Sequence, residues 1–110
     1  MATNLLEVNK AHEATVKAIY DRRTAISKVG GAGPELDAWV AAAEEVAAVA
    51  VDVFRYQRMV ELAMKPAHRD GLAMKLGELI LRHNALVGEL PHVEAELVEV
   101  CPKAAEIKLG

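Results

Sequence analysis

Residues 38–54 form a run in which almost every side chain is apolar, and this run constrains the fold more than any other part of the chain. Alanine is its commonest residue and has the highest helix propensity, so the run predicts a helix. A surface helix of a small bundle needs only one apolar stripe, about 100° wide. This helix is apolar around most of its circumference. It therefore needs several helices of its own chain, another copy, or a different protein to cover it.

The charges in and after this run argue against a membrane span. Glu44, Glu45 and Asp52 interrupt the run, and Arg55 and Arg58 follow it closely. Each charge at the centre of a spanning helix costs about 2.5–3.5 kcal/mol of insertion free energy. The N-terminus also lacks the basic and then apolar pattern of a signal peptide. We therefore expect a soluble, cytoplasmic protein.

A break at residues 30–34, of sequence Gly-Gly-Ala-Gly-Pro, separates the first two predicted helices. Glycine adopts the left-handed conformation that ends many helices, and proline suits the first turn of the next one. Asn4 followed by Glu7 has the spacing of a capping box at the start of the first helix. So short a connection between two long helices predicts an antiparallel helical hairpin.

Further breaks predict that two shorter helices follow the hairpin. Pro66 is expected to end the second helix, because the residue before proline avoids the helical region. Asp70 is placed to cap a third helix that Gly88 closes, and Pro91 to open a fourth. Alternation of apolar and polar residues over 93–97 leaves a short strand as the alternative to the fourth helix. The predicted helices span residues of about 4–28, 35–64, 71–88 and 91–101, followed by a short turn at 103–108.

Together these elements predict one all-α domain over residues 1–110. Its architecture is a long antiparallel helical hairpin packed with two shorter helices in a helical bundle. The apolar fraction of 53% is enough for a core that folds without help. The inner face of the first helix is expected to hold Leu5, Val8, His12, Val16, Ile19, Arg23 and Ile26.

Two histidines, His12 and His83, lie on faces that are otherwise apolar. We expect both to be core residues whose polar ring nitrogens find hydrogen-bond partners. The alternative is a pH-sensitive contact at an interface, because the ordinary pKa of histidine is about 6.5.

Charge is distributed unevenly along the chain, whose formal net charge is −3 at pH 7. Counted from the sequence, residues 1–29 carry +2, 35–64 carry −4, 65–84 carry +2 and 85–110 carry −3. Neighbouring antiparallel segments of opposite sign attract, which predicts charge complementarity inside the molecule. The acidic balance argues against nucleic acid as a partner, because phosphate neutralisation dominates such binding.

Two motifs suggest ligand binding, and in each case the surrounding residues favour a structural role. The glycine-rich break lacks the Lys-Ser or Lys-Thr of a phosphate loop, and Glu35 would repel a phosphate. Residues 72–77 have the spacing that opens a DNA-reading helix-turn-helix. The chain then continues as helix without a turn and offers few side chains to base edges. We therefore interpret these segments as a turn and a core helix.

Metal and catalytic chemistry are not expected either. Glu89 and His92 share the Glu-x-x-His spacing of di-iron bundles, and Glu96 lies one turn beyond, but the motif occurs once and contains Pro91. Ser27 is the only serine and has no histidine near it in the sequence. The single cysteine permits no disulfide within the chain and has acidic neighbours that do not activate a thiol. We expect no enzyme activity, metal or cofactor.

The remaining candidates are contact residues of the second helix. Aromatic and arginine side chains are enriched at binding hot spots. The residues expected at a partner interface are Trp39, Val46, Val49, Val53, Arg55, Tyr56, Arg58 and Met59. They predict a non-catalytic protein–protein interaction module, either a homo-oligomer or a small subunit of a larger assembly. The alternatives are a small phage-type inhibitor or adaptor that blocks a host protein complex, and a helical DNA-associated regulator.

Overall fold

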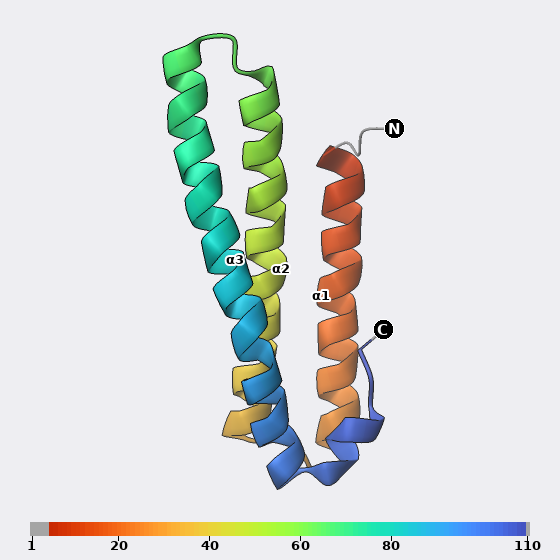
Figure 1. Ribbon diagram of the computed structural model, residues 1–110. Coiled ribbons are helices and arrows are strands. Elements are labelled where there is room, and N and C mark those ends of the chain that lie inside the picture. Colours follow the sequence, from red (N-terminus) through yellow and green to blue (C-terminus); the bar gives the residue numbers. More distant parts are fainter. Residues whose placement is uncertain (1–4, 110) are drawn as a thin grey trace.

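Three long helices make up most of residues 5–109, the part of the chain that a computed structural model describes (Figure 1). They are α1 (Leu5–Lys28), α2 (Pro34–Leu62) and α3 (Pro66–Val100), and a short 3-10 helix, η1 (Pro102–Glu106), follows. The α2 helix packs against both α1 and α3. The all-α helical bundle that the sequence predicts is therefore confirmed.

The turn between α1 and α2 forms as predicted. Gly30 has a φ of 86°, in the left-handed region, and the Gly31 N–H donates to the Ile26 carbonyl at 2.9 Å. This bond satisfies one of the carbonyls that the end of α1 leaves without a helical partner. Pro34 then occupies the first turn of α2. The capping box predicted at Asn4 lies outside the described residues.

The predicted break between Gly88 and Pro91 is wrong, because α3 runs through both residues as one helix. Proline lacks an N–H and leaves the carbonyl four residues earlier without its usual partner. That carbonyl belongs to Val87, a residue that is 44% exposed, and a backbone group on an exposed side of a helix can bond to water instead. Residues 93–97 also lie within α3, which excludes the strand alternative.

The start of α3 also differs from the prediction. The helix begins at Pro66 rather than after Asp70, and Lys65 precedes it in an extended conformation. Proline at a helix start loses no helical bond, since the first N–H groups have no partner there. The two shorter helices of the prediction are thus a single long one. The α2 helix ends at Leu62, two residues before the predicted end at 64, and Met64 is 92% exposed.

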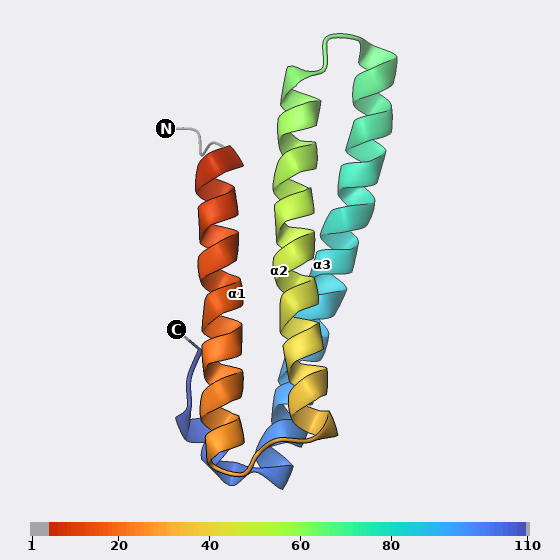
Figure 2. The ribbon, with the colours of Figure 1, turned by 180° about the vertical axis from the view of Figure 1, so that it is seen from behind.

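The hydrophobic core gathers at one end of the bundle, where the C-terminal segment turns back beside α1 (Figure 1). We call this region the closed end. It is formed by the buried residues Ile19, Ile26, Leu36, Trp39, Leu97 and Ala104, with Val93 and Ile107 packed against them. At the other end, α1 and α3 lie on opposite sides of α2 (Figure 2).

The resulting molecule is elongated. Its principal extents are 55 × 24 × 19 Å, and its radius of gyration is 17.0 Å. A compact domain of this length would have a radius of gyration of about 13 Å. In so narrow a molecule, many side chains of the three helices have no further helix to cover them.

Candidate protein-binding face

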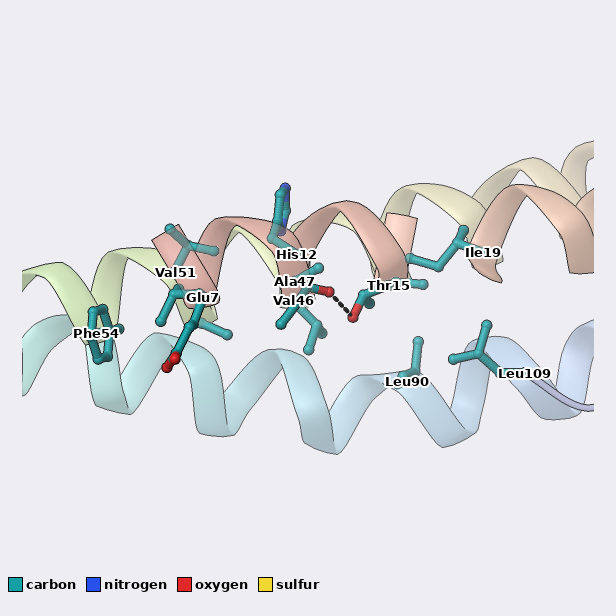
Figure 3. Close-up of a pocket in the computed structure, with 14 residues that line it drawn as sticks. Glu7, His12, Thr15, Ile19, Val46, Ala47, Val51, Phe54, Leu90 and Leu109 are labelled. Atoms are coloured by element: carbon teal, nitrogen blue, oxygen red, sulfur yellow. Dashed lines mark hydrogen bonds between the residues drawn. The ribbon is translucent and has the colours of Figure 1, made fainter. Parts of the chain in front are cut away.

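An apolar groove lies beside α2 above the closed end, with α1 along one side (Figure 3). Its cavity volume is about 480 Å³. We call this groove the open face and define it by Ala11 and Thr15 of α1, Val46, Ala50 and Phe54 of α2, and Leu90 of α3. Leu90 points from α3 toward α1 across the gap between them, and Leu109 lies beside it (Figure 3).

The floor of the open face continues a stripe of α2 that is core elsewhere. Leu36, Trp39 and Ala43 follow one another at three- and four-residue spacings and are buried at the closed end. Val46 and Ala50 continue the same spacing, yet Val46 is half-buried and Ala50 is exposed. One helix face is therefore a core at one end and an uncovered surface at the other.

The groove extends toward the tip of the hairpin between α2 and α3. A second cavity of about 400 Å³ shares Phe54 with the first and is lined also by Leu5, Arg55, Arg58, Met59 and Leu62. Large apolar side chains are uncovered here: Leu5 is 47% exposed and Leu62 is 69% exposed. The open face is thus apolar in its middle, and Arg55 and Arg58 lie at this end, where Arg58 pairs with Glu61 at 3.2 Å and Glu7 also lines the groove.

Arg22 explains why the other end is closed. Its side chain is 6% exposed, and its guanidinium lies 4.5 Å from the centre of the Trp39 ring. The two terminal nitrogens donate to the Glu94 carboxylate at 2.7 and 2.6 Å. Further bonds go to the carbonyls of Ile107 at 2.6 Å and Ala104 at 3.0 Å. One side chain thereby joins α1, α2, α3 and the C-terminal segment.

Arg22 was missed by the sequence prediction, which placed Arg23 on the inner face of α1. Arg23 is exposed. Both positions satisfy the three- and four-residue spacing between Ile19 and Ile26, and both residues are arginine, so the pattern could not choose between them.

Polar contacts between helices join segments of opposite charge, in agreement with the predicted internal complementarity. The Tyr20 hydroxyl of α1 donates to the Glu44 carboxylate of α2 at 2.6 Å. Arg82 of α3 pairs with Glu45 of α2. The hydrogen bond to Glu44, followed by the charge of that carboxylate, raises the pKa of Tyr20 above its ordinary value.

The predicted interface residues of α2 do not all reach the surface. Trp39 and Val49 are buried within this chain, at 3% and 5% exposure. Val46 lines the open face, and Arg55, Arg58 and Met59 line its extension. Val53 and Tyr56 are half-buried.

The predicted interface residues did not include Ala50 and Phe54 of α2, Ala11 and Thr15 of α1, or Leu90 of α3. Alanine and threonine carry no interface signal in a sequence, and a single leucine or phenylalanine is as typical of a core. Their role depends on which helix faces meet.

Candidate sites for other chemistry are dispersed. Ser27 is exposed and Cys101 is buried. Within residues 5–109, His, Cys, Asp and Glu side chains do not gather in groups of three that could hold a metal ion. None of the helices described has an apolar stretch long enough to cross a bilayer.

His12 departs from the expectation for a core histidine. Its side chain is half-buried and its Nδ1 atom is buried without a hydrogen-bond partner in the described structure. His83 is also half-buried.

Comparison with known proteins gives no family to which these features could be referred: no family model, curated protein or solved structure matches this chain.

Proposed function

We propose that this protein is a non-catalytic interaction module that associates with another polypeptide through the open face. The observation that carries the proposal is the uncovered stripe of α2, on which Val46 and Ala50 prolong the buried row of Trp39 and Ala43. Apolar area removed from water contributes about 25 cal/mol per Å². Covering this stripe would therefore favour association.

The composition of the open face supports this proposal. Its floor on α2 is formed by alanine, valine and phenylalanine, polar residues of α1 such as Glu7 and Thr15 lie along one side, and Arg55 and Arg58 lie at one end. Protein interfaces commonly combine a charge-depleted apolar centre with a polar rim. A groove between helices also suits a helix as the element that fills it, as in the binding of amphipathic helices by helical grooves. We infer a cytoplasmic setting, where a single buried thiol such as Cys101 remains reduced.

Two alanines of α2 provide a matched pair of variants that tests the proposal. Ala50 lines the open face, whereas Ala48 is exposed and does not line its cavity. Ala50→Glu places a charge in the groove, and Ala48→Glu adds the same charge outside it. Both side chains start from the surface, so both variants should fold, with matching circular dichroism and urea midpoints.

The measurement is binding to a partner that has first been identified and purified, whether another protein or the chain itself. Ala50→Glu should weaken that binding about 100-fold or more, because a carboxylate buried without a partner costs several kcal/mol. Ala48→Glu should bind as the wild type does. Equal binding by both variants would contradict the proposal.

A further inference from the structure

We infer that the partner at the open face is a second copy of this chain, with two open faces packed together around a two-fold axis and their α2 helices antiparallel. This inference rests on the proposed function and names its partner. Three observations carry it: the surface area, the shape of the face and the arrangement of charge.

The surface area of the chain exceeds that of a self-sufficient monomer. The accessible surface is 7336 Å², whereas a folded monomer of 11.9 kDa is expected to expose about 5,900 Å². The excess is about 1,400 Å². A standard interface buries about 800 Å² on each partner. A standard interface between two copies would therefore remove more than half of this excess from each chain.

The shape of the open face suits a symmetric contact. A two-fold interface must be complementary to itself, so side chains near the axis meet their own counterparts. Ala11 and Ala50 lie in the open face with only a methyl group each. Small side chains at this position allow two helical layers to approach to the ordinary 8–10 Å separation. Phe54 and Leu90 lie to either side, where each can fill the groove of the other copy.

The charges select the antiparallel orientation. Arg55 and Arg58 lie at the end of the open face nearest the tip of the hairpin. Residues 93–109, which carry a net charge of −2, lie at the closed end (Figure 1). An antiparallel pair brings the arginine pair of each copy toward the acidic segment of the other. A parallel pair would place the two arginine pairs together, where like charges repel.

One other apolar surface competes with the open face as a contact between copies. Met74 and Leu81 of α3 are 72% and 71% exposed. Neither residue lines the cavity of the open face or its extension. The test must therefore separate these two surfaces.

The first part of the experiment measures molar mass by light scattering after size exclusion, from low to high micromolar protein. The wild type should show about twice the chain mass of 11.9 kDa, falling on dilution. Ala48→Glu should behave as the wild type, and Ala50→Glu should weaken dimerisation about 100-fold or more. A wild type that stays monomeric throughout this range would overturn the inference.

The second part locates the axis. Ala50→Cys should form a disulfide between copies under mild oxidation, whereas Ala48→Cys and Leu81→Cys should not. Cys101 is replaced by Ser in all three variants and in a common background control, because the introduced cysteine must be the only thiol in the chain. A dimer that joins through Leu81→Cys would overturn the inference.

The two proposals fail differently. A monomeric wild type removes the second copy as partner but leaves the binding test on a different purified protein intact. A dimer that survives Ala50→Glu removes the open face itself, and with it the proposed function.

Discussion

The closed end and the open face are built on the same stripe of α2, yet one is a finished core and the other is not. At the closed end, Leu36 and Trp39 are covered by α3, η1 and the C-terminal segment. At the open face, Val46 and Ala50 line a cavity that residues of α1 and α3 also line, and Val46 is half-buried and Ala50 exposed. The difference comes from what covers the stripe rather than from the stripe itself.

This comparison shows that a periodic apolar pattern predicts a helix face that will be covered, without saying by which chain. The C-terminal segment lies beside the part of α1 nearest the closed end (Figure 1). On α2 the same three- and four-residue spacing of apolar residues continues through Val46 and Ala50. We interpret the remainder of the stripe as surface that a second chain covers.

The variant Arg22→Ala, from which we expect the greatest loss of stability, tests whether Arg22 holds the closed end together. Arg22→Ala should lower the free energy of unfolding by about 4 kcal/mol, because it leaves Glu94 and two carbonyls without their donor and uncovers Trp39. Urea unfolding measures this change. The neighbouring exposed Arg23→Ala should alter it by less than about 0.5 kcal/mol. Equal losses for the two variants would mean that the closed end does not depend on this residue.

A second prediction compares the two ends within α2. Leu36→Ala should cost about 3 kcal/mol of folding stability, because Leu36 is 1% exposed in the core. Phe54→Ala should cost only about 1 kcal/mol, because that ring is half-buried in the groove. Both variants are made with Ala50→Glu present, so that unfolding reports on a single chain. A larger cost at Phe54 than at Leu36 would show that the open face is core.

Two glycines give effects of opposite sign. A methyl group at Gly31 would overlap Ile26 Cγ2 and lie 2.9 Å from Cys101 Sγ, so Gly31→Ala should destabilise the closed end by about 2 kcal/mol. A methyl group at Gly88 meets nothing, and the residue lies inside α3, so Gly88→Ala should stabilise by up to about 1 kcal/mol. Thermal or urea unfolding reads out both. A destabilising Gly88→Ala would favour the helix end that the sequence predicts there.

The smallest change is expected from the hydrogen bond between Tyr20 of α1 and Glu44 of α2. Glu44→Gln should lower the pKa of Tyr20 toward its ordinary value, because a neutral amide oxygen accepts a weaker hydrogen bond than the carboxylate and the negative charge is lost. The contact favours protonated Tyr20, so its stabilising contribution is present below about pH 10 and is lost as pH rises through the raised pKa. Ultraviolet titration in a Tyr56→Phe background observes Tyr20 alone. An unchanged titration curve would mean that this contact does not persist in solution.

How far the sequence predicts the molecule depends on whether the information is local. The turn at 30–34 and the limits of α1 and α2 follow from glycine, proline and apolar spacing, which act over a few residues. Pro91 misleads because its effect depends on whether water reaches the Val87 carbonyl. The choice between Arg22 and Arg23 depends on where the C-terminal segment lies, and Ala50 belongs to the groove only because α1 and α3 flank it. These are tertiary facts that no local pattern contains.

The most direct test of the open face as the contact surface is an isotope-filtered nuclear Overhauser experiment. The sample mixes labelled and unlabelled chains, so only contacts between different copies give signals. If two open faces pack together, signals should link the Ala50 methyl group to Val46, Phe54 and Leu90 of the other chain. Signals from Met74 and Leu81 instead, or no signals between chains at millimolar concentration, would contradict it.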